Sequence, residues 1–426
     1  MIKTIKRIIR NFHLSEVFEV ISRELSLPIN SGKIITLMGV RRCGKTSILY
    51  DVINQLSQNI DKTSILFFNF EDERLNLDIE SLDLILQAYQ ELYPDNKMSD
   101  CYFFFDEIQN ISGWEKFVRR VYDSVSKNIF ITGSNSKMLS SDIATSLRGR
   151  TITYEVFPLS FREYLKFEDI KIDLYSSQNL ALIHNRLDKY LSQGGFPEVV
   201  LLDDRFQQKI LQDYFSVLIY KDLVERFDIR NTHALKFFLK RILASSTKQI
   251  SINKIYNDLK SSGIKVGKNS LHAYLQYVED IYLSLTLNQY KYKISSGSDR
   301  KVYSIDIGLN NAVSYKFSDD IGKAMENTVF LELRRREKEI FYYSDRTSEC
   351  DFIICEKDQI VAAIQVTYNM ENDATKKREV KGLLNACKKF ELTTGIIITY
   401  DQEGEFEADG ISVRLVPLYL FLLELS

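Results

Sequence analysis

An apolar strand, a loop with two glycines and a helix follow one another near the N-terminus, and this order constrains the fold more than any other feature. The loop GVRRCGKT, residues 39–46, has the spacing G-x-x-x-x-G-K-[ST], and the apolar segment 34–38 precedes it. Glycines at these places let successive backbone N–H groups face a phosphate at the start of a helix. We therefore expect a phosphate-binding loop on a parallel sheet.

The expected ligand of this loop is ATP with Mg²⁺. Lys45 would reach the β- and γ-phosphates, and the Thr46 hydroxyl would hold the metal ion. The residues predicted to contact the nucleotide are Gly39, Val40, Arg41, Arg42, Cys43, Gly44, Lys45, Thr46 and Ser47.

A second apolar segment, CYFFFDEIQ at residues 101–109, places two carboxylates at the end of an expected buried strand. Asp106 is predicted to hold Mg²⁺ through its water shell, and Glu107 to polarise the attacking water. Glu107, Asp106 and Lys45 are thus the predicted catalytic residues, and the pair of acids indicates hydrolysis as well as binding. The alternative is two solvated acids at a strand end.

Two arginines, Arg148 and Arg150, stand just before a further strand expected at residues 151–157. One of them could be an arginine finger that acts across a subunit interface and stabilises transition-state charge. This interpretation implies a homo-oligomer. The alternative is that both are surface arginines on a turn.

Eight segments, in their order along the chain, strongly resemble the AAA+-like prokaryotic P-loop ATPases of the MNS/STAND-related branch. They are GVRRCGKTS, FFNFEDERL, FFFDEIQNISGWEKFVRRVYD, ITGSNSKMLS, LRGR, FPLSFREYL, GGFPEVV and YKDLVERFDIRN. The resemblance covers nearly the whole chain. It implies that Ser134 and Asn135 form a polar sensor of the γ-phosphate. It also implies a helical lid, a winged helix and a C-terminal domain of unknown function that resembles PD-(D/E)xK nucleases.

The predicted fold class is α/β, with a P-loop parallel-sheet ATPase core that carries a helical lid and a winged helix, followed by a second α/β domain similar to restriction endonucleases. The expected boundaries are 1–158 for the ATPase core, 159–231 for the lid, 232–300 for the winged-helix domain and 301–426 for the nuclease-like domain.

The winged-helix segment is the most basic neighbourhood of the chain. Its second helix, expected at residues 269–280, would present Lys268, Asn269, Ser270 and His272 to solvent, which suits phosphates and base edges of DNA. Further basic residues expected nearby are Lys254, Lys260, Lys265, Lys291, Lys293, Arg300 and Lys301. The alternative is a spacer between domains with a solvated basic face.

The C-terminal domain would retain the geometry of a nuclease site without its chemistry. By role, Glu326, Asp351, Gln365 and Thr367 take the positions of the helix Glu, the strand Asp, the Glu and the Lys of the nuclease motif. An amide is a weak ligand for a hard cation, and threonine lacks the charge of lysine, so metal-dependent cleavage is not expected unless Glu349 substitutes.

This domain is instead expected to bind nucleic acid or a partner protein. The residues predicted to do so are Arg334, Arg335, Arg336, Lys376, Lys377 and Arg378. The alternative for each charge cluster is a solvated face.

Composition limits the other possibilities. The 56 basic and 58 acidic residues nearly cancel, so any nucleic-acid binding must come from a local patch. Five cysteines without a CxxC pair, and the lack of a long apolar run, favour a soluble cytoplasmic protein that does not bind membranes. The basic, amphipathic N-terminus is expected to pack on the first domain, with a membrane-surface or nucleic-acid arm as the alternative.

The sequence thus predicts Mg²⁺-dependent ATP hydrolysis coupled to the binding or remodelling of DNA, including branched or foreign DNA. One alternative is an ATP-dependent regulatory switch or scaffold that binds a protein partner. Another is an active metal-dependent nuclease.

Overall fold

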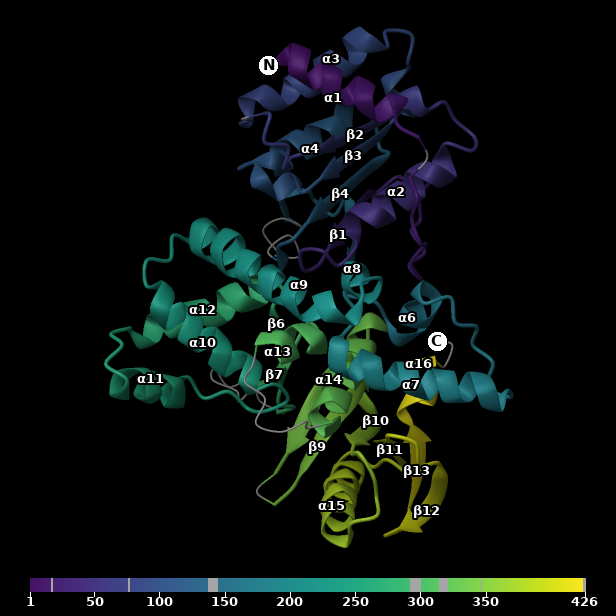
Figure 1. Ribbon diagram of the computed structural model, residues 1–426, viewed down its shortest axis with the longest axis vertical. Coiled ribbons are helices and arrows are strands. Elements are labelled where there is room, and N and C mark those ends of the chain that lie inside the picture. Colours follow the sequence, from purple (N-terminus) through teal and green to yellow (C-terminus); the bar gives the residue numbers. More distant parts are fainter. Residues whose placement is uncertain are drawn as a thin grey trace. The chain divides into compact units, whose positions relative to one another are not determined.

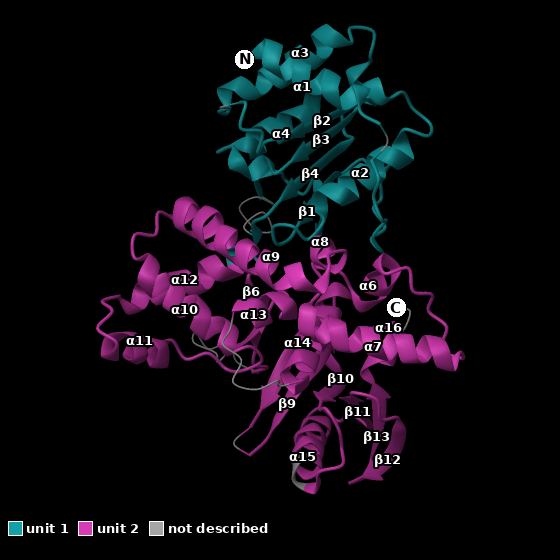
Figure 2. Ribbon diagram, viewed as in Figure 1, with its two compact units in different colours: residues 1–156, 280–282 teal, residues 157–279, 283–426 magenta. Residues whose placement is uncertain are grey.

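The computed structural model describes residues 1–16, 18–75, 77–136, 145–291, 300–313, 321–345 and 347–423, without the side chains of residues 374 and 375. The chain divides into two compact units (Figure 2). The first comprises residues 1–156 and 280–282, and the second comprises residues 157–279 and 283–426.

The first unit is built on a parallel five-stranded sheet with the strand order β2-β3-β4-β1-β5 (Figure 1). Its strands are β1 (Ile34–Met38), β2 (Ile65–Asn69), β3 (Tyr102–Asp106), β4 (Ile129–Gly133) and β5 (Thr151–Glu155). Every residue of β1 and of β4 is buried, as expected for a parallel sheet that is covered on both faces. Because β4 lies between β1 and β3, side chains at its carboxyl end can reach groups that follow either neighbour.

Helices and short 3₁₀ turns connect these strands. They are α1 (Ile2–Leu14), α2 (Lys45–Leu56), η1 (Lys62–Ser64), η2 (Glu80–Leu82), α3 (Asp83–Leu92), η3 (Met98–Asp100), η4 (Ile108–Asn110) and α4 (Trp114–Ser124). Helix α1 buries Ile5, Ile9 and Phe12, which share one helix face, and it packs against α3 and β2. The expectation that the N-terminus packs on the first domain is therefore confirmed.

The second unit begins with a helical region. Its elements are α6 (Phe161–Phe167), α7 (Ser177–Gln193), α8 (Pro197–Val200), α9 (Asp204–Val217) and the π-helix η6 (Leu218–Glu225). A capping box starts α6, because the Ser160 hydroxyl accepts from the backbone N–H of Glu163, and the Glu163 carboxylate accepts from that of Ser160.

Three further helices and a pair of antiparallel strands follow. They are α10 (Thr232–Ala244), α11 (Ile252–Ser261), α12 (Lys268–Asp280), β6 (Ser284–Asn288) and β7 (Arg300–Ser304). Helix α12 buries Leu271, Tyr274, Leu275 and Val278, the residues that the sequence pattern assigns to its inner face.

The C-terminal part contains a mixed six-stranded sheet with the order β12-β13-β11-β10-β9-β8. Strands β10, β11 and β13 run parallel, and the other pairings are antiparallel. Its elements are α13 (Ile307–Val313), α14 (Ile321–Arg335), β8 (Glu339–Ser344), β9 (Glu349–Glu356), β10 (Gln359–Val366), α15 (Asp373–Lys389), β11 (Thr394–Thr399), β12 (Gly404–Ala408), β13 (Ile411–Pro417) and α16 (Leu418–Leu423). The predicted order along the chain, a parallel-sheet core followed by a helical region and a second α/β part, is thus confirmed.

Arg334, Arg335 and Arg336, which the sequence analysis predicts to bind nucleic acid or a partner protein, are only partly exposed, and two of them are engaged within the second unit. Arg335 Nη1 lies 2.7 Å from Glu332 Oε2, and its Nη2 donates to the carbonyl oxygen of Pro158 at 3.0 Å. Arg336 Nε donates to Glu332 Oε1 at 2.9 Å, and its Nη2 donates to the carbonyl oxygen of Phe421 at 2.5 Å. Both guanidinium groups therefore bind within the fold and anchor α14.

Membrane insertion of a helix finds no support. Among the residues that the structure describes, no helix combines the length and the apolar character needed to cross a bilayer.

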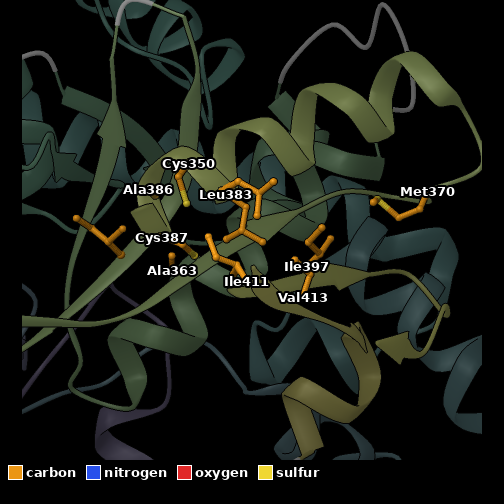
Figure 3. Packing of buried hydrophobic residues seen from close by; sticks show 11 residues of the cluster. Cys350, Ala363, Met370, Leu383, Ala386, Cys387, Ile397, Ile411 and Val413 are labelled. Carbon is orange, nitrogen blue, oxygen red and sulfur yellow. The ribbon is translucent and has the colours of Figure 1, made fainter. Parts of the chain in front are cut away.

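Helix α15 packs on the C-terminal sheet through a cluster of buried apolar side chains (Figure 3). The cluster contains Cys350, Ile353, Ala363, Met370, Leu383, Leu384, Ala386, Cys387, Ile397, Ile411 and Val413. At Gly382 the helix comes so close to β9 that a Cβ atom would lie 2.1 Å from the carbonyl oxygen of Glu349. The helix cannot approach the sheet this closely with any side chain at this position.

We expect Gly382→Ala to destabilise the second unit by about 1–3 kcal/mol, because the added methyl group forces α15 away from the sheet. Calorimetric unfolding measures the change. Gly404→Ala is the control, since a Cβ atom there would meet only Leu415 Cδ1, at 3.9 Å. Equal stabilities of the two variants would contradict the close approach at Gly382.

Candidate functional site

The predicted phosphate-binding loop joins the carboxyl end of β1 to the first residue of α2. Gly44, with a φ of 101°, has a left-handed conformation that residues with a Cβ atom rarely adopt, and Lys45 begins the helix directly after it. At Gly39 a Cβ atom would lie 2.0 Å from the carbonyl oxygen of Val156. The backbone therefore requires both glycines, one for its conformation and one for close approach.

The Lys45 ammonium is buried inside this loop. Its Nζ donates to the carbonyl oxygens of Gly39 at 3.0 Å and Val40 at 3.1 Å, and it lies 3.4 Å from Glu107 Oε1. Burial alone would lower the pKa of Lys45, but nearby negative groups, above all Glu107, raise it above its usual value. The side chain therefore remains a cation at the place where phosphate charge is expected.

Hydroxyl groups surround the carboxylate of Asp106, the last residue of β3. Thr46 Oγ1 donates toward Oδ1 and Oδ2 at 3.1 and 3.0 Å, and Thr132 Oγ1 donates to Oδ1 at 2.6 Å. Burial and the charge of Glu107 raise the pKa of Asp106 to about 6. The Thr46 hydroxyl and the Asp106 carboxylate form a pair of oxygen donors of the kind that Mg²⁺ prefers.

Glu107 has a strained backbone directly after β3. Its φ of 53° lies in the left-handed region, which costs a residue other than glycine about 1–2 kcal/mol. Its backbone N–H donates to Thr132 Oγ1 at 2.8 Å, and its Oε2 accepts from Gln109 Nε2 at 2.5 Å. Burial would raise the pKa of Glu107, but Lys45 and the Gln109 hydrogen bond hold it below its usual value. Glu107 is thus a fixed carboxylate in the ionised form that a general base requires.

Together these groups fit ATP with Mg²⁺. The loop ends at the start of α2, where a helix N-terminus favours anions and Lys45 supplies positive charge. Thr46 and Asp106 supply oxygen ligands for the metal ion, and Glu107 supplies a base. All of them lie at the carboxyl end of the parallel sheet.

The other predicted loop residues have various surroundings. Arg41 forms a bidentate contact with the Glu71 carboxylate. Its Nη2 donates to Oε1 at 2.8 Å, and its Nη1 donates to Oε2 at 3.1 Å. Cys43 is buried, which raises the pKa of its thiol, whereas Arg42 and Ser47 are exposed.

The two predicted sensor residues directly follow β4. Ser134 is buried, and its Oγ accepts from Gln109 Nε2 at 3.3 Å, so it joins the hydrogen bonds around Glu107. Asn135 is only partly buried. Ser134 is thus linked to the site by Gln109, a residue that the sequence analysis did not identify.

The two candidate arginine fingers differ in their surroundings. Arg150 is engaged within its own chain, because its Nε donates to Asp123 Oδ1 at 3.0 Å and its guanidinium lies over the ring of Tyr122. Arg148 is exposed on the preceding turn.

Sequence reasoning missed Thr132 and Gln109. Thr132 links the Asp106 carboxylate to the Glu107 backbone, and Gln109 links Glu107 to Ser134. The signal that could have identified Thr132 is a polar residue at the end of an otherwise apolar strand. Using that signal requires the strand order, because β4 must lie beside β3.

The predicted nucleic-acid residues lie at the start of α12. Lys268, Asn269, Ser270 and His272 are all exposed, and Lys268 Nζ donates to Asn253 Oδ1 at 2.9 Å. Of the further basic residues expected nearby, Lys293 lies outside the described residues. Lys301 does not belong to a basic surface, since it is buried.

Three of the four predicted residues of the nuclease-like site come together. The backbone N–H of Asp351 donates to Gln365 Oε1 at 3.2 Å, and Glu326 and Asp351 both accept from Lys301. Thr367 is buried, and its hydroxyl donates to the carbonyl oxygen of Asn369 at 3.3 Å.

These residues do not fit a divalent metal ion. The centre of the carboxylate group holds the Lys301 ammonium, and the Gln365 amide donates away from it to Glu379 Oε2 at 2.5 Å. Within the described part of the chain, no three His, Cys, Asp or Glu side chains are arranged to hold a metal ion.

We expect Thr132→Val to lower the stability of the first unit by about 1–3 kcal/mol, because the Glu107 N–H and the Asp106 carboxylate lose a buried partner. Urea unfolding followed by fluorescence of Trp114, the single tryptophan, measures the change. Thr132→Ser keeps the hydroxyl and should stay close to the original protein. A valine variant of unchanged stability would contradict the role of this hydroxyl.

Comparisons with protein families divide the chain into three parts. Residues 31–165 match an AAA domain, residues 184–320 match a domain of unknown function (DUF8612), and residues 321–421 match a domain of unknown function (DUF4143). The first match is to a P-loop ATPase domain and covers the site around Lys45.

The chain is also similar to curated proteins and to solved structures. It is 39% identical to the uncharacterized protein MJ1544 of Methanocaldococcus jannaschii over 98% of this chain and 94% of that protein. It is 30% identical to an uncharacterized protein of Haemophilus influenzae over 90% of this chain and 93% of that protein. The structure of the Aeropyrum pernix Orc1 protein in complex with DNA matches at 14% identity and a TM-score of 0.32, over 66% of this chain and 86% of that chain. A match this distant says nothing about what the present chain binds.

The identity to MJ1544 extends along nearly the whole of both proteins, through the AAA domain and both domains of unknown function. The chain therefore belongs to the same family as MJ1544.

Proposed function

We propose that this protein hydrolyses ATP in a Mg²⁺-dependent reaction at the AAA domain. The observation that carries the proposal is the convergence of Lys45, Thr46, Asp106 and Glu107 at one edge of the parallel sheet. A loop that only binds a nucleotide has no need of a second, strained and ionised carboxylate beside the lysine.

Each residue has a distinct role in this proposal. Lys45 binds the β- and γ-phosphates, and Thr46 and Asp106 hold Mg²⁺. Held there by Thr46 and Asp106, the metal ion would supply positive charge that offsets the charge developing on the phosphates. Glu107 accepts the proton of the attacking water at its carboxylate, and Gln109 fixes the orientation of that carboxylate.

We predict that Glu107→Gln lowers kcat for ATP hydrolysis by about 10²–10⁴-fold, because the amide cannot accept the proton, while ATP still binds. Lys45→Ala should weaken ATP binding about 10- to 100-fold, through loss of charge-assisted hydrogen bonds to phosphate. Phosphate release and the anisotropy of a fluorescent ATP analogue measure the two effects.

Lys116→Ala, at an exposed position of α4, is the control and should leave both quantities unchanged. Full turnover by Glu107→Gln would exclude Glu107 as the base. Undiminished ATP binding by Lys45→Ala would exclude the loop itself as the site.

We further infer a homo-oligomer in which Arg148 contacts the nucleotide of a neighbouring subunit. Its exposure supports this choice, because Arg150 is already engaged with Asp123. A sizing column run with and without ATP would report the change in mass.

We infer that the second unit binds DNA. We infer that residues 159–231 act as a lid, 232–300 as a winged helix and 301–426 as a nuclease-like domain without cleavage. Support comes from α12, which exposes Lys268, Asn269, Ser270 and His272 at its first turns and buries its apolar face. Such a helix offers donors to phosphates and base edges.

We predict DNA-stimulated ATP turnover, and a loss of about one unit from the salt dependence of DNA binding in Lys268→Ala, because one phosphate contact disappears. The measurements are ATPase rate and DNA affinity with single-stranded, duplex and junction DNA at two salt concentrations. The control is Lys97→Ala, which removes an exposed lysine of the first unit.

ATP turnover that is indifferent to every DNA form, without salt-sensitive binding, would contradict the DNA proposal. The regulatory switch would then be favoured if the mass on a sizing column changes with the nucleotide.

A further inference from the structure

A buried lysine occupies the middle of the three carboxylates in the nuclease-like part of the second unit. Lys301 lies on β7, Glu326 on α14, and Glu349 and Asp351 on β9 (Figure 1). The side chain of Lys301 is 3% exposed, against 9% for Asp351, 14% for Glu326 and 39% for Glu349. The ammonium is thus more deeply buried than any of its partners.

The ammonium is surrounded by these carboxylates, since it donates hydrogen bonds to Glu326 and Asp351 and forms an ion pair with Glu349. An ammonium has three donors, and Lys301 Nζ lies 2.7 Å from Glu349 Oε1, 3.0 Å from Asp351 Oδ1 and 3.1 Å from Glu326 Oε1. Burial would lower the pKa of Lys301, but the negative groups around it, Asp351 foremost, raise it well above its usual value. Lys301 therefore stays charged inside the protein.

Two of the carboxylates accept further hydrogen bonds within the fold. Asp351 Oδ2 accepts from the backbone N–H of Val366 at 3.1 Å, and Glu326 Oε1 also accepts from the Tyr303 hydroxyl at 2.8 Å. Burial and the charge of Asp351 raise the pKa of Glu326, and the neighbouring Lys301 offsets this rise only in part.

The Lys301 ammonium occupies the place among the acids that a metal ion would need. Three carboxylate oxygens surround its Nζ at 2.7–3.1 Å, so a metal ion bound by all three acids would require the ammonium to leave. Gln365, the fourth expected ligand, is also engaged, because its Oε1 accepts from the backbone N–H of Asp351 and its Nε2 donates to Glu379.

We propose that the Lys301 ammonium is the resident cation of this carboxylate cluster and that it excludes divalent metal ions from the site. The cluster then needs no metal to be stable. Its function is structural, because it fixes β7 to α14 and β9.

The test compares Lys301→Met with the original full-length protein, free of nucleotide, in titrations with Mn²⁺ followed by electron paramagnetic resonance. The original protein and Asp351→Asn should bind the same amount of Mn²⁺. Lys301→Met should gain one Mn²⁺ site, and Lys301→Met/Asp351→Asn should lack it. Lys301→Arg is the matched control and should gain no site, because it keeps the charge.

Thermal unfolding gives the second readout. Without Mn²⁺, Lys301→Met should unfold about 10 °C lower, because three buried carboxylates lose their cation. Mn²⁺ should restore part of this loss in Lys301→Met and leave the original protein unchanged.

Three outcomes would overturn the proposal. They are Mn²⁺ binding by the original protein that Asp351→Asn removes, a folded Lys301→Met protein that gains no Mn²⁺ site, and an unchanged unfolding temperature in Lys301→Met. If Lys301→Met does not fold, the proposal is still tested by comparing the Mn²⁺ binding of the original protein with that of Asp351→Asn and Lys301→Arg. Metal-dependent cleavage of plasmid or branched DNA that Asp351→Asn abolishes would also overturn it.

Discussion

A charged group inside a protein is stable only where opposite charges and hydrogen bonds replace water, and two buried lysines organise this molecule around that constraint. In the first unit, Lys45 has the Glu107 carboxylate and two carbonyl oxygens of the loop as partners. In the second unit, Lys301 has three carboxylates. The surroundings of Lys45 suit a cation that exchanges protein partners for phosphate, whereas Lys301 is held by acids of its own unit.

The nucleotide site could be predicted from the sequence because its chemistry is local. The glycines, Lys45 and Thr46 lie within one loop, and Asp106 and Glu107 are neighbours at a strand end. Thr132 could not be predicted in the same way, because its role depends on β4 lying between β3 and β1. Hydrogen bonds that cross between strands become visible only with the strand order.

The group of acids around Lys301 in the second unit shows the same limit more sharply. Asp351 contacts Gln365 and shares Lys301 with Glu326, and the sequence pattern had assigned these three residues to one site. It counted Lys301 among surface charges, since a lysine in a basic stretch has no local feature that marks it as buried. The same limit applies to Arg335 and Arg336, whose carbonyl partners belong to Pro158 and Phe421, 177 and 85 residues away.

The three contacts of Lys301 also have a consequence for inheritance within the family. A metal site can lose one ligand and still retain its ion, because water fills the position. Loss of Glu326 or Asp351 leaves a donor of the buried ammonium without its recorded partner, and loss of the lysine leaves several acids without a counter-charge. Lys301, Glu326 and Asp351 should therefore be kept or lost together among relatives, as a set that changes in concert.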